Sequence, residues 1–402
     1  MTRVLAFAAL WLFVFGTALA GGWSVMFKIS YLLLLLFGVA WLWTRLSQYA
    51  LVIRREPLTP RSQVGEPVRE RLSVSNTWWL PKPWLEVQAD SALTGHQGRF
   101  FLSLPARATW SGLLESRATR RGLYLLGPTR VATGDPFGFF RHEWEFPADT
   151  SVLVYPATID LPQFRPLQGA LAGGGQRRER VPHATAMAAG LRDYQPGDPF
   201  NRIHWPNSAR LGRLVVKEFE EDPVSDVWVV LDLDRNLHRA EGPTSPEEQG
   251  VTIAASVARH LLLQNRAVGL LTQRHVLEPD RGARQLLKIL ELLAVVRPRE
   301  WQSVGALLLS TTARFGRGTS IIVITPTVRT DWLAALEDLR LRGIPSTVIL
   351  QDPVAPDATS GLMALIAALA AARVPYYVVK PDQPLDQALG APPAVEALAR
   401  PV

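Results

Sequence analysis

The stretch Val227-Trp228-Val229-Val230-Leu231-Asp232-Leu233-Asp234-Arg235-Asn236 decides the fold of the C-terminal part of this chain. Residues 227–233 form a largely apolar run rich in β-branched side chains, which is typical of a strand buried on both faces of a parallel sheet. The acidic residues at its end would stand at the carboxyl edge of the sheet. Ligands of open α/β sheets bind beyond that edge.

Strand and helix signals alternate on both sides of this stretch. Further strands are predicted at residues 267–272, 320–325, 346–350 and 376–379, and helices at 246–263, 283–296, 331–341 and 361–372. The first helix has a clear start, because Ser245 can cap it, Pro246 suits its first position and Glu248 completes a capping box. Repeated strand-helix alternation predicts a doubly wound α/β domain over residues 223–402.

Upstream lies the most distinctive segment of the chain. It combines a Pro-Gly-Asp-Pro turn at residues 196–199 with many charged side chains, which would be costly to bury unless they are paired. We therefore expect an internal network centred on the turn. Its candidate members are Arg192, Tyr194, Gly197, Asp198, Arg202, Trp205, Arg210, Lys217 and Glu218.

This segment resembles the signature of the bacterial domain-of-unknown-function 58 (DUF58) family, R-x-Y-x-x-G-D-x-x-R-x-I-x-W-x-x-S/T-A-R followed by L-x-V-K/R. The matching residues are Arg192, Tyr194, Gly197, Asp198, Arg202, Ile203, Trp205, Ser208, Ala209, Arg210, Leu214, Val216 and Lys217. A second family-like piece runs from Arg121 to Pro128 and leads to Asp135-Pro136-Phe137-Gly138. The resemblance therefore covers essentially the whole chain.

The resemblance implies two N-terminal membrane spans, a β-domain and a domain similar to the von Willebrand factor A fold. Genes of this family often lie beside those of MoxR-type AAA+ ATPases, which implies a partnership in assembling or remodelling other proteins. In von Willebrand A domains the first strand is followed by D-x-S-x-S, whose oxygens bind a cation such as Mg²⁺. Asp232, Asp234 and Asn236 keep oxygen ligands at that spacing.

Two observations speak against a complete metal site of that kind. The threonine expected after the second helical stretch is replaced near Trp301-Gln302, and Thr325-Pro326-Thr327 stands where an aspartate is usual. The competing interpretation is that Asp232 and Asp234 are loop carboxylates that cap a helix or pair with Arg235. A motif match remains a hypothesis until its structural context is known.

Residues 48–165 are predicted to form a β-rich domain. Short runs with strand character are separated by proline, glycine and asparagine, and residues 68–74 alternate apolar with polar side chains. Further strands are predicted at 84–88, 99–104, 122–126, 129–133 and 151–155, which indicates a small β-sandwich or barrel. Residues 166–222 hold the signature segment and a glycine-rich linker at 173–180.

Two apolar segments in residues 1–47, Val4–Ala20 and Met26–Trp43, predict a transmembrane helical hairpin. Arg3 precedes the first, and Arg45, Arg54, Arg55 and Arg61 follow the second, so the positive-inside rule places both flanks in the cytoplasm. The localisation expected is a multi-pass protein of the bacterial inner membrane. An alternative for the first segment is a signal peptide cleaved after Ala18-Leu19-Ala20.

The composition of the chain excludes several classes of function. The 402 residues include no cysteine, which excludes a disulfide framework and thiolate chemistry. The net charge of +7 comes mainly from arginine without a nucleic-acid-binding motif, so no nucleic-acid partner is expected. No P-loop, zincin or nucleophile-elbow motif is present. We expect a non-enzymatic, membrane-anchored scaffold that binds a protein partner, with a MoxR-type AAA+ ATPase as the candidate.

Two other functions stay open at this point. One is a metal-dependent hydrolase or transferase that uses Asp232, Asp234, Asp198 and His204 together. The other is an adhesion or sensing module displayed outside the cell, which would need the opposite topology. His204 beside Trp205 has a structural interpretation as well, and the oligomeric state is not indicated.

Overall fold

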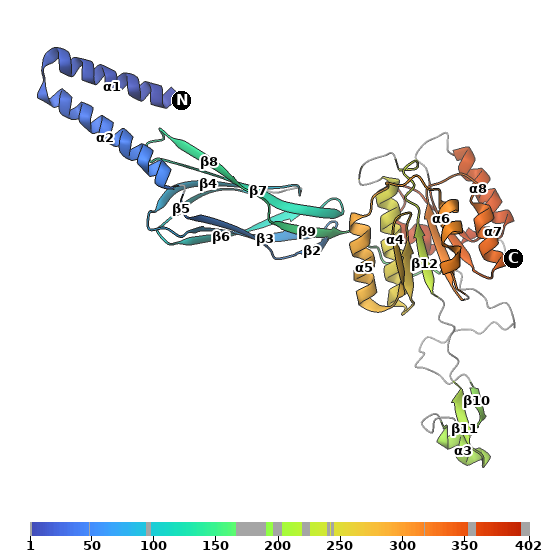
Figure 1. Cartoon of the computed structure of the whole chain (residues 1–402). Helices are drawn as coiled ribbons and strands as arrows, with labels where there is room; N and C mark the ends of the chain where they lie inside the picture. The colour runs from blue at the N-terminus through green and yellow to red at the C-terminus, as the bar shows by residue number, and fades with distance from the viewer. Residues whose placement is uncertain are drawn as a thin grey trace. The chain divides into compact units, whose positions relative to one another are not determined.

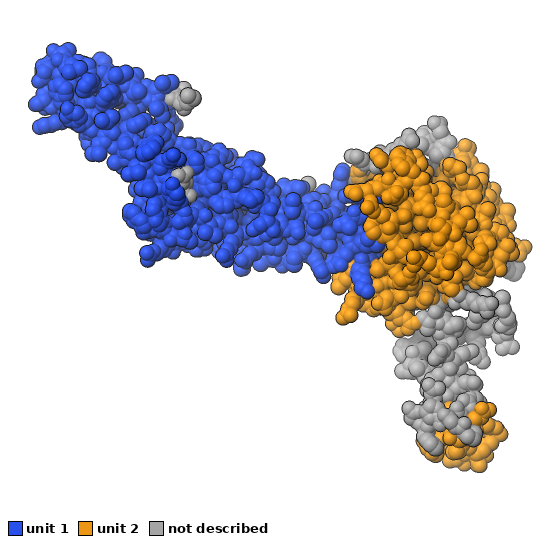
Figure 2. Space-filling view, in the orientation of Figure 1, with its two compact units in different colours: residues 1–158, 288–297 blue, residues 159–287, 298–402 orange. Residues whose placement is uncertain are grey.

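The computed structural model describes residues 2–47, 49–93, 98–165, 190–195, 203–218, 226–238, 242, 245–316, 318–352 and 359–394. The chain divides into two compact units (Figure 2). Unit 1 comprises residues 1–158 with 288–297, and unit 2 comprises 159–287 with 298–402. The division runs through one helix, α5 (Gly282–Val295). The predicted linker at 173–180 lies outside the described residues.

Unit 1 begins with two long apolar helices, α1 (Thr2–Gly21) and α2 (Ser24–Ser47), labelled in Figure 1. Both are long and apolar enough to cross a membrane. Gly22, at a φ of 61°, makes the turn between them, and the rings of Phe7 and Phe37 stack across the pair 5.0 Å apart. They are a helical hairpin, as the sequence predicts.

The rest of unit 1 is built mainly of β-strands. These are β1 (Leu51–Pro57), β2 (Arg61–Gln63), β3 (Pro67–Asn76), β4 (Lys82–Ser91), β5 (Arg99–Leu104), β6 (Thr109–Arg117), β7 (Gly122–Gly134), β8 (Arg141–Phe146) and β9 (Thr150–Tyr155). They form one sheet in the order β1-β3-β6 and a second in the order β2-β9-β7-β4-β5, with β8 paired to β7. Leu72 and Val74 of the first sheet share a core with Leu85 and Val87 of the second. The region is therefore β-rich, with two sheets enclosing a common core.

One buried ion pair lies within these strands. Arg55 donates to the Glu70 carboxylate through Nε at 2.9 Å and Nη2 at 2.6 Å, and through Nη1 to the carbonyl oxygen of Asp90 at 2.8 Å. Both charged side chains are almost fully buried. The bidentate geometry offsets the cost of removing two charges from water.

The main part of unit 2 is a mixed sheet of six strands in the order β14-β13-β12-β15-β16-β17. The strands are β12 (Val227–Leu231), β13 (Val268–Leu271), β14 (Val276–Asp280), β15 (Ser320–Thr325), β16 (Ser346–Gln351) and β17 (Tyr376–Val379). Neighbouring strands are parallel except β13 and β14, which are antiparallel. The C-terminal part is thus an α/β region, as expected, with one antiparallel edge strand that the sequence analysis missed.

Helices cover the sheet. They are α4 (Pro246–Leu263), α6 (Val304–Thr311), α7 (Leu333–Leu341) and α8 (Thr359–Ala371), with a short α9 (Leu385–Gly390) and a 3₁₀ turn at Thr312–Arg314. Figure 1 shows α4 on one face and α6, α7 and α8 on the other. The Ser245 hydroxyl accepts a hydrogen bond from Glu248 N at 3.3 Å, so the predicted cap of α4 is confirmed.

Residues 159–165, which the sequence analysis assigns to the β-rich domain, are bound within unit 2. Ile159 N donates to the Ser256 hydroxyl at 3.0 Å, and Asp160 pairs with Arg259 at 2.6 Å. His260 contacts the Phe164 carbonyl oxygen at 3.1 Å. This short segment therefore lies along α4.

Candidate functional site

The carboxyl edge of the unit 2 sheet brings together the ends of its central strands. Asp232 follows β12, Thr325 ends the neighbouring β15, and Gln273 comes soon after β13 on the other side. The strand order therefore delivers three polar side chains to one place. Asp232 is fully buried there, with no exposed surface.

The Asp232 carboxylate is surrounded by hydrogen-bond donors. Its Oδ2 accepts from the Thr325 hydroxyl at 2.6 Å, and its Oδ1 accepts from Gln273 Nε2 at 2.7 Å and from Asp234 N at 3.1 Å. Burial raises the pKa of Asp232 above its usual value, although these hydrogen bonds and nearby His238 act in the opposite direction. The protein thus holds this carboxyl group with its own donors.

Gln273 binds both the side chain and the main chain of the Asp232 loop. Besides its bond to Asp232, its Oε1 accepts from Leu233 N at 2.8 Å and its Nε2 reaches the Gln302 carbonyl oxygen at 3.2 Å. It therefore ties the loop after β12 to the loop before α6. Sequence reasoning did not single out Gln273, although its position just beyond a predicted parallel strand placed it at the same edge.

Asp234 and Asn236 form a local turn in the same loop. The Asp234 Oδ1 atom accepts from both Asn236 N and Asn236 Nδ2 at 3.0 Å. This is a side-chain-to-backbone turn of the kind that aspartate favours in loops. The interpretation of Asp234 as a loop carboxylate describes these contacts well.

The predicted Mg²⁺ ligands are therefore close in sequence and share one loop. Their oxygens are of the type that Mg²⁺ prefers, yet the contacts above already engage Asp232 and Asp234 with protein donors. Within the described part of the chain, no group of three or more histidine, aspartate or glutamate side chains could hold a metal ion. Mg²⁺ binding by Asp232, Asp234 and Asn236 stays a prediction.

An exposed aromatic side chain stands beside this loop. The Arg235 guanidinium lies over the Trp301 ring, with Cζ 5.0 Å from the ring centroid, and Arg235 N donates to the Glu300 carbonyl oxygen at 2.9 Å. Trp301 is 64% exposed. The indole therefore lies at the sheet edge with most of its surface open to solvent.

The signature segment forms a small structure of its own. Strand β10 (Gly190–Asp193) pairs antiparallel with β11 (Val215–Glu218), and α3 (Trp205–Leu211) lies between them in the chain. The Ser208 hydroxyl accepts from Val215 N at 3.0 Å, and Tyr194 N donates to the Leu214 carbonyl oxygen at 2.9 Å. The serine of the signature thus fastens the helix to the strand.

The predicted charge network is described only in part. Gly197, Asp198 and Arg202 lie outside the described residues, as do the side chains of Arg192, Lys217 and Glu218. Trp205 and Arg210 are exposed on α3. The ion pair that is described, Arg213 with Asp193 at 2.9 Å, involves two residues that the prediction did not include.

His204 has a structural role in the same segment. Its Nδ1 accepts a hydrogen bond from Asn207 N at 3.2 Å, which caps α3, and its own N donates to the Val215 carbonyl oxygen at 2.9 Å. Capping a helix N-terminus requires an acceptor and involves no reaction. The structural interpretation of His204 accounts for these contacts.

The model of the family described as "Protein of unknown function DUF58" matches residues 190–366. The curated relative "Uncharacterized protein YeaD" of Bacillus subtilis (strain 168) is 25% identical over 181 residues, which cover 44% of this chain and 43% of that protein. The match therefore spans less than half of the relative's length.

Solved structures show weak similarity. The CARDB domain of the PF1109 protein from Pyrococcus furiosus is 14% identical and covers 26% of this chain and 91% of its own, with a TM-score of 0.20. Proximal thread matrix protein 1 from the mussel byssus is 10% identical and covers 42% of this chain and 44% of its own, with a TM-score of 0.28. Neither likeness bears on function. Over residues 190–366, the segment that opens with β10 and extends across the carboxyl edge of the sheet, the chain is similar to the DUF58 family.

Proposed function

We propose that this chain is a membrane-anchored scaffold that binds a protein partner at the carboxyl edge of a von Willebrand A-like α/β domain. The observation that carries the proposal is the Trp301–Arg235 pair beside the Asp232 loop. Tryptophan and arginine are the residues most often found at the energetic centre of protein interfaces. A backbone hydrogen bond from Arg235 N to the Glu300 carbonyl oxygen joins the two loops next to the pair, which would reduce the ordering needed on binding.

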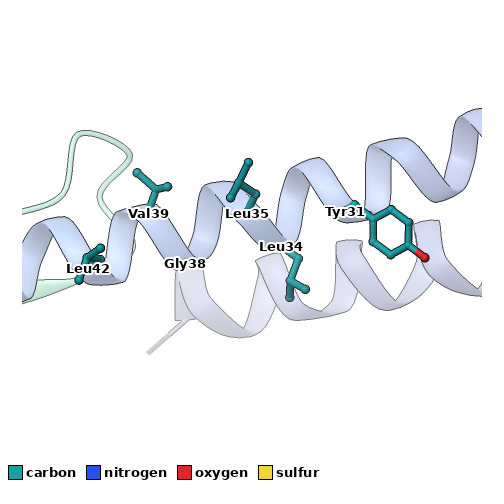
Figure 3. A pocket seen from close by; sticks show the side chains of 6 residues that line it. All are labelled: Tyr31, Leu34, Leu35, Gly38, Val39 and Leu42. Carbon is teal, nitrogen blue, oxygen red and sulfur yellow. The ribbon is translucent and has the colours of Figure 1, made fainter.

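The hairpin supplies the anchor in this proposal. The apolar windows of α1 and α2 are only 6% and 11% buried, so the helices do not resemble the core helices of a soluble protein. Figure 3 shows apolar side chains along α2. Residues of this helix line a hollow of about 470 Å³. Its lining residues are Tyr31, Leu34, Leu35, Gly38, Val39 and Leu42. Such a surface suits lipid acyl chains.

Arginine positions support the cytoplasmic side for the soluble part. Arg3 lies in the first turn of α1, Arg45 lies in the last turn of α2, and Arg54 follows in β1. Such positive flanks are retained in the cytoplasm. A partner on that side fits the class that the family resemblance implies, a MoxR-type AAA+ ATPase in protein assembly or remodelling.

The enzymatic alternative has less support in the described contacts. His204 is engaged as a helix cap, Asp232 is enclosed by three donors, and Asp198 lies outside the described residues. A hydrolytic centre needs an acid or base within reach of a substrate. We therefore favour binding over catalysis.

Co-purification tests the proposed function. The full-length tagged protein, solubilised in mild detergent, would be assayed for retention of the MoxR-type ATPase. Trp301→Ala should reduce retention at least tenfold, the loss of about 1.4 kcal/mol or more that a hot-spot residue carries. Leu263→Ala is the matched control, because Leu263 is a large apolar residue, 72% exposed, at the C-terminal end of α4.

Two outcomes would count against the proposal. Equal retention by the Trp301→Ala variant and the wild type would remove this edge as the binding surface. Equal loss in both variants would indicate a general effect on folding. Repeating the assay with Asp232→Ala and with a chelator tests the metal separately, because binding that survives both would exclude an ion bridging the two proteins.

A further inference from the structure

Within unit 1, the loop between β7 and β8 reaches the membrane hairpin. It carries the sequence Asp135-Pro136-Phe137-Gly138-Phe139-Phe140. The Phe139 ring lies 4.9 Å from that of Phe7 in α1, and the Phe140 ring lies 5.0 Å from that of Phe37 in α2. We call residues 135–140 the aromatic loop.

The helix residues that it contacts are deep in the hairpin. At 1.5 Å per residue, the 24 residues of α2 extend about 36 Å, whereas the hydrocarbon core is about 30 Å thick. For an upright helix that starts at the far boundary of the core, the near boundary falls close to Thr44. Phe37 then lies about 10 Å inside it. A loop packed on Phe37 reaches acyl-chain depth as well.

The backbone of the aromatic loop is suited to a medium without water. The Asp135 carboxylate accepts from Phe137 N at 2.9 Å and Phe140 N at 2.6 Å. Gly138 N donates to the Asp135 carbonyl oxygen at 3.2 Å, and Asp135 N to that of Phe140 at 3.4 Å. Unpaired backbone groups are costly in lipid, and irregular backbone is tolerated there when it is satisfied by protein.

Arg3 completes the contact between loop and hairpin. Its Nη1 donates to the Gly138 carbonyl oxygen at 3.3 Å. Gly138 has a φ of 73°, in the left-handed region that favours glycine, and a Cβ there would stand 2.6 Å from Arg3 Nη1. A long arginine side chain can stretch along the apolar surface while its head group stays at the interface.

We propose that the aromatic loop is inserted into the bilayer, at the boundary between headgroups and acyl chains, so that the β-rich part of unit 1 is bound to lipid as well as tethered. Its exposed tip provides the lipid contact. Phe137 is 52% exposed beside Pro136 and Gly138, while Phe139 and Phe140 face the hairpin. The lipid-facing surface of α1 and α2 thereby continues onto the loop. This inference rests on the membrane anchoring proposed above.

The test uses the absence of cysteine from the chain. Single cysteines introduced as Phe137→Cys, Leu35→Cys and Leu123→Cys in the full-length protein would each carry a nitroxide spin label in phosphatidylcholine vesicles. The measured quantity is the ratio of collision rates with molecular oxygen, which concentrates in lipid, and with a water-soluble nickel chelate. All three side chains are exposed, so the labels should not disturb packing.

Leu35 in α2 reports on the hairpin, and Leu123, at the other end of β7, reports on the aqueous part. The inference predicts a ratio at residue 137 that approaches the ratio at 35 and exceeds the ratio at 123. A high ratio at 35 with an aqueous ratio at 137 would overturn loop insertion and leave the anchor intact. An aqueous ratio at 35 would overturn the anchor itself.

Discussion

The Lys82 ammonium of β4 lies 2.5 Å from the carbonyl oxygen of Ser47, the last residue of α2. It also donates to the Tyr49 carbonyl oxygen at 3.0 Å, and the lysine is fully buried. Burial lowers the pKa of Lys82 below its usual 10.5. A cation at the C-terminus of a helix is favoured by the helix dipole, so this contact joins the hairpin to the β-strands of unit 1.

Replacing this lysine should weaken the junction. Lys82→Met keeps the length of the side chain but leaves the buried Ser47 carbonyl oxygen and the partly buried Tyr49 carbonyl oxygen without their donor, at a cost of about 1–3 kcal/mol. Thermal unfolding of the protein in detergent micelles would measure it. Lys380→Met is the control, because Lys380 is exposed. Equal melting temperatures for the two variants would contradict the structural role.

The buried pair Arg55–Glu70 predicts a larger effect. Arg55→Met leaves the Glu70 carboxylate without its bidentate partner, and breaking a buried pair in this way typically costs about 3–5 kcal/mol. Denaturant unfolding of the variant provides the measurement. Arg69→Met, on the neighbouring strand β3, is the matched control. The ion pair of Arg69 with Glu115 is largely exposed and should contribute much less to the free energy of unfolding. A similar loss in both variants would show that burial is not the cause.

At the sheet edge, Thr325→Val should destabilise unit 2. The substitution preserves the shape of the side chain and removes the hydroxyl that donates to Asp232 Oδ2, for a cost of about 1–3 kcal/mol. Thr325→Ser, which restores the hydroxyl, should recover most of that stability. Urea unfolding of the wild type and the two variants would measure the free energy of unfolding of each. If Thr325→Ser is as unstable as Thr325→Val, the loss comes from packing and not from the hydroxyl.

His260 predicts a pH dependence. Burial lowers its pKa below 6.5, although the Phe164 carbonyl oxygen acts in the opposite direction. Between the lowered pKa and 6.5 the unfolded state binds a proton that the folded state does not, so stability falls as the pH drops through this window. The stability is not reduced by this group above pH 6.5, where His260 is neutral in both states. His260→Gln should flatten the profile of unfolding free energy against pH, and an unchanged slope would exclude this histidine as the source.

Much of the α/β region could be predicted from sequence, because its central strands are buried on both faces. The runs at 320–325 and 376–379 coincide with β15 and β17, and the predicted helix 246–263 coincides with α4. Strand β14 escaped detection because it is an edge strand with Pro279 and charged residues, and its side chains are exposed or half-buried. Helix α6 was missed although Ser303 caps it.

The candidate site was predicted less completely. The acidic residues after β12 follow directly from the strand pattern, and Thr325 was placed at the same edge. Their contact, however, depends on β12 lying between β13 and β15, which no local pattern reveals. The same holds for Gln273. In the sequence, Trp301 marks only the place where the threonine of a metal site is replaced. Its contact with the Arg235 guanidinium depends on the fold of two separate loops.

The segment 159–165 along α4 has a mechanical consequence. Any tension that reaches unit 2 through residue 158 acts first on the Ile159–Ser256 hydrogen bond and the Asp160–Arg259 ion pair, both on α4. A load along this segment is therefore borne first by a helix whose buried face packs on the central strands.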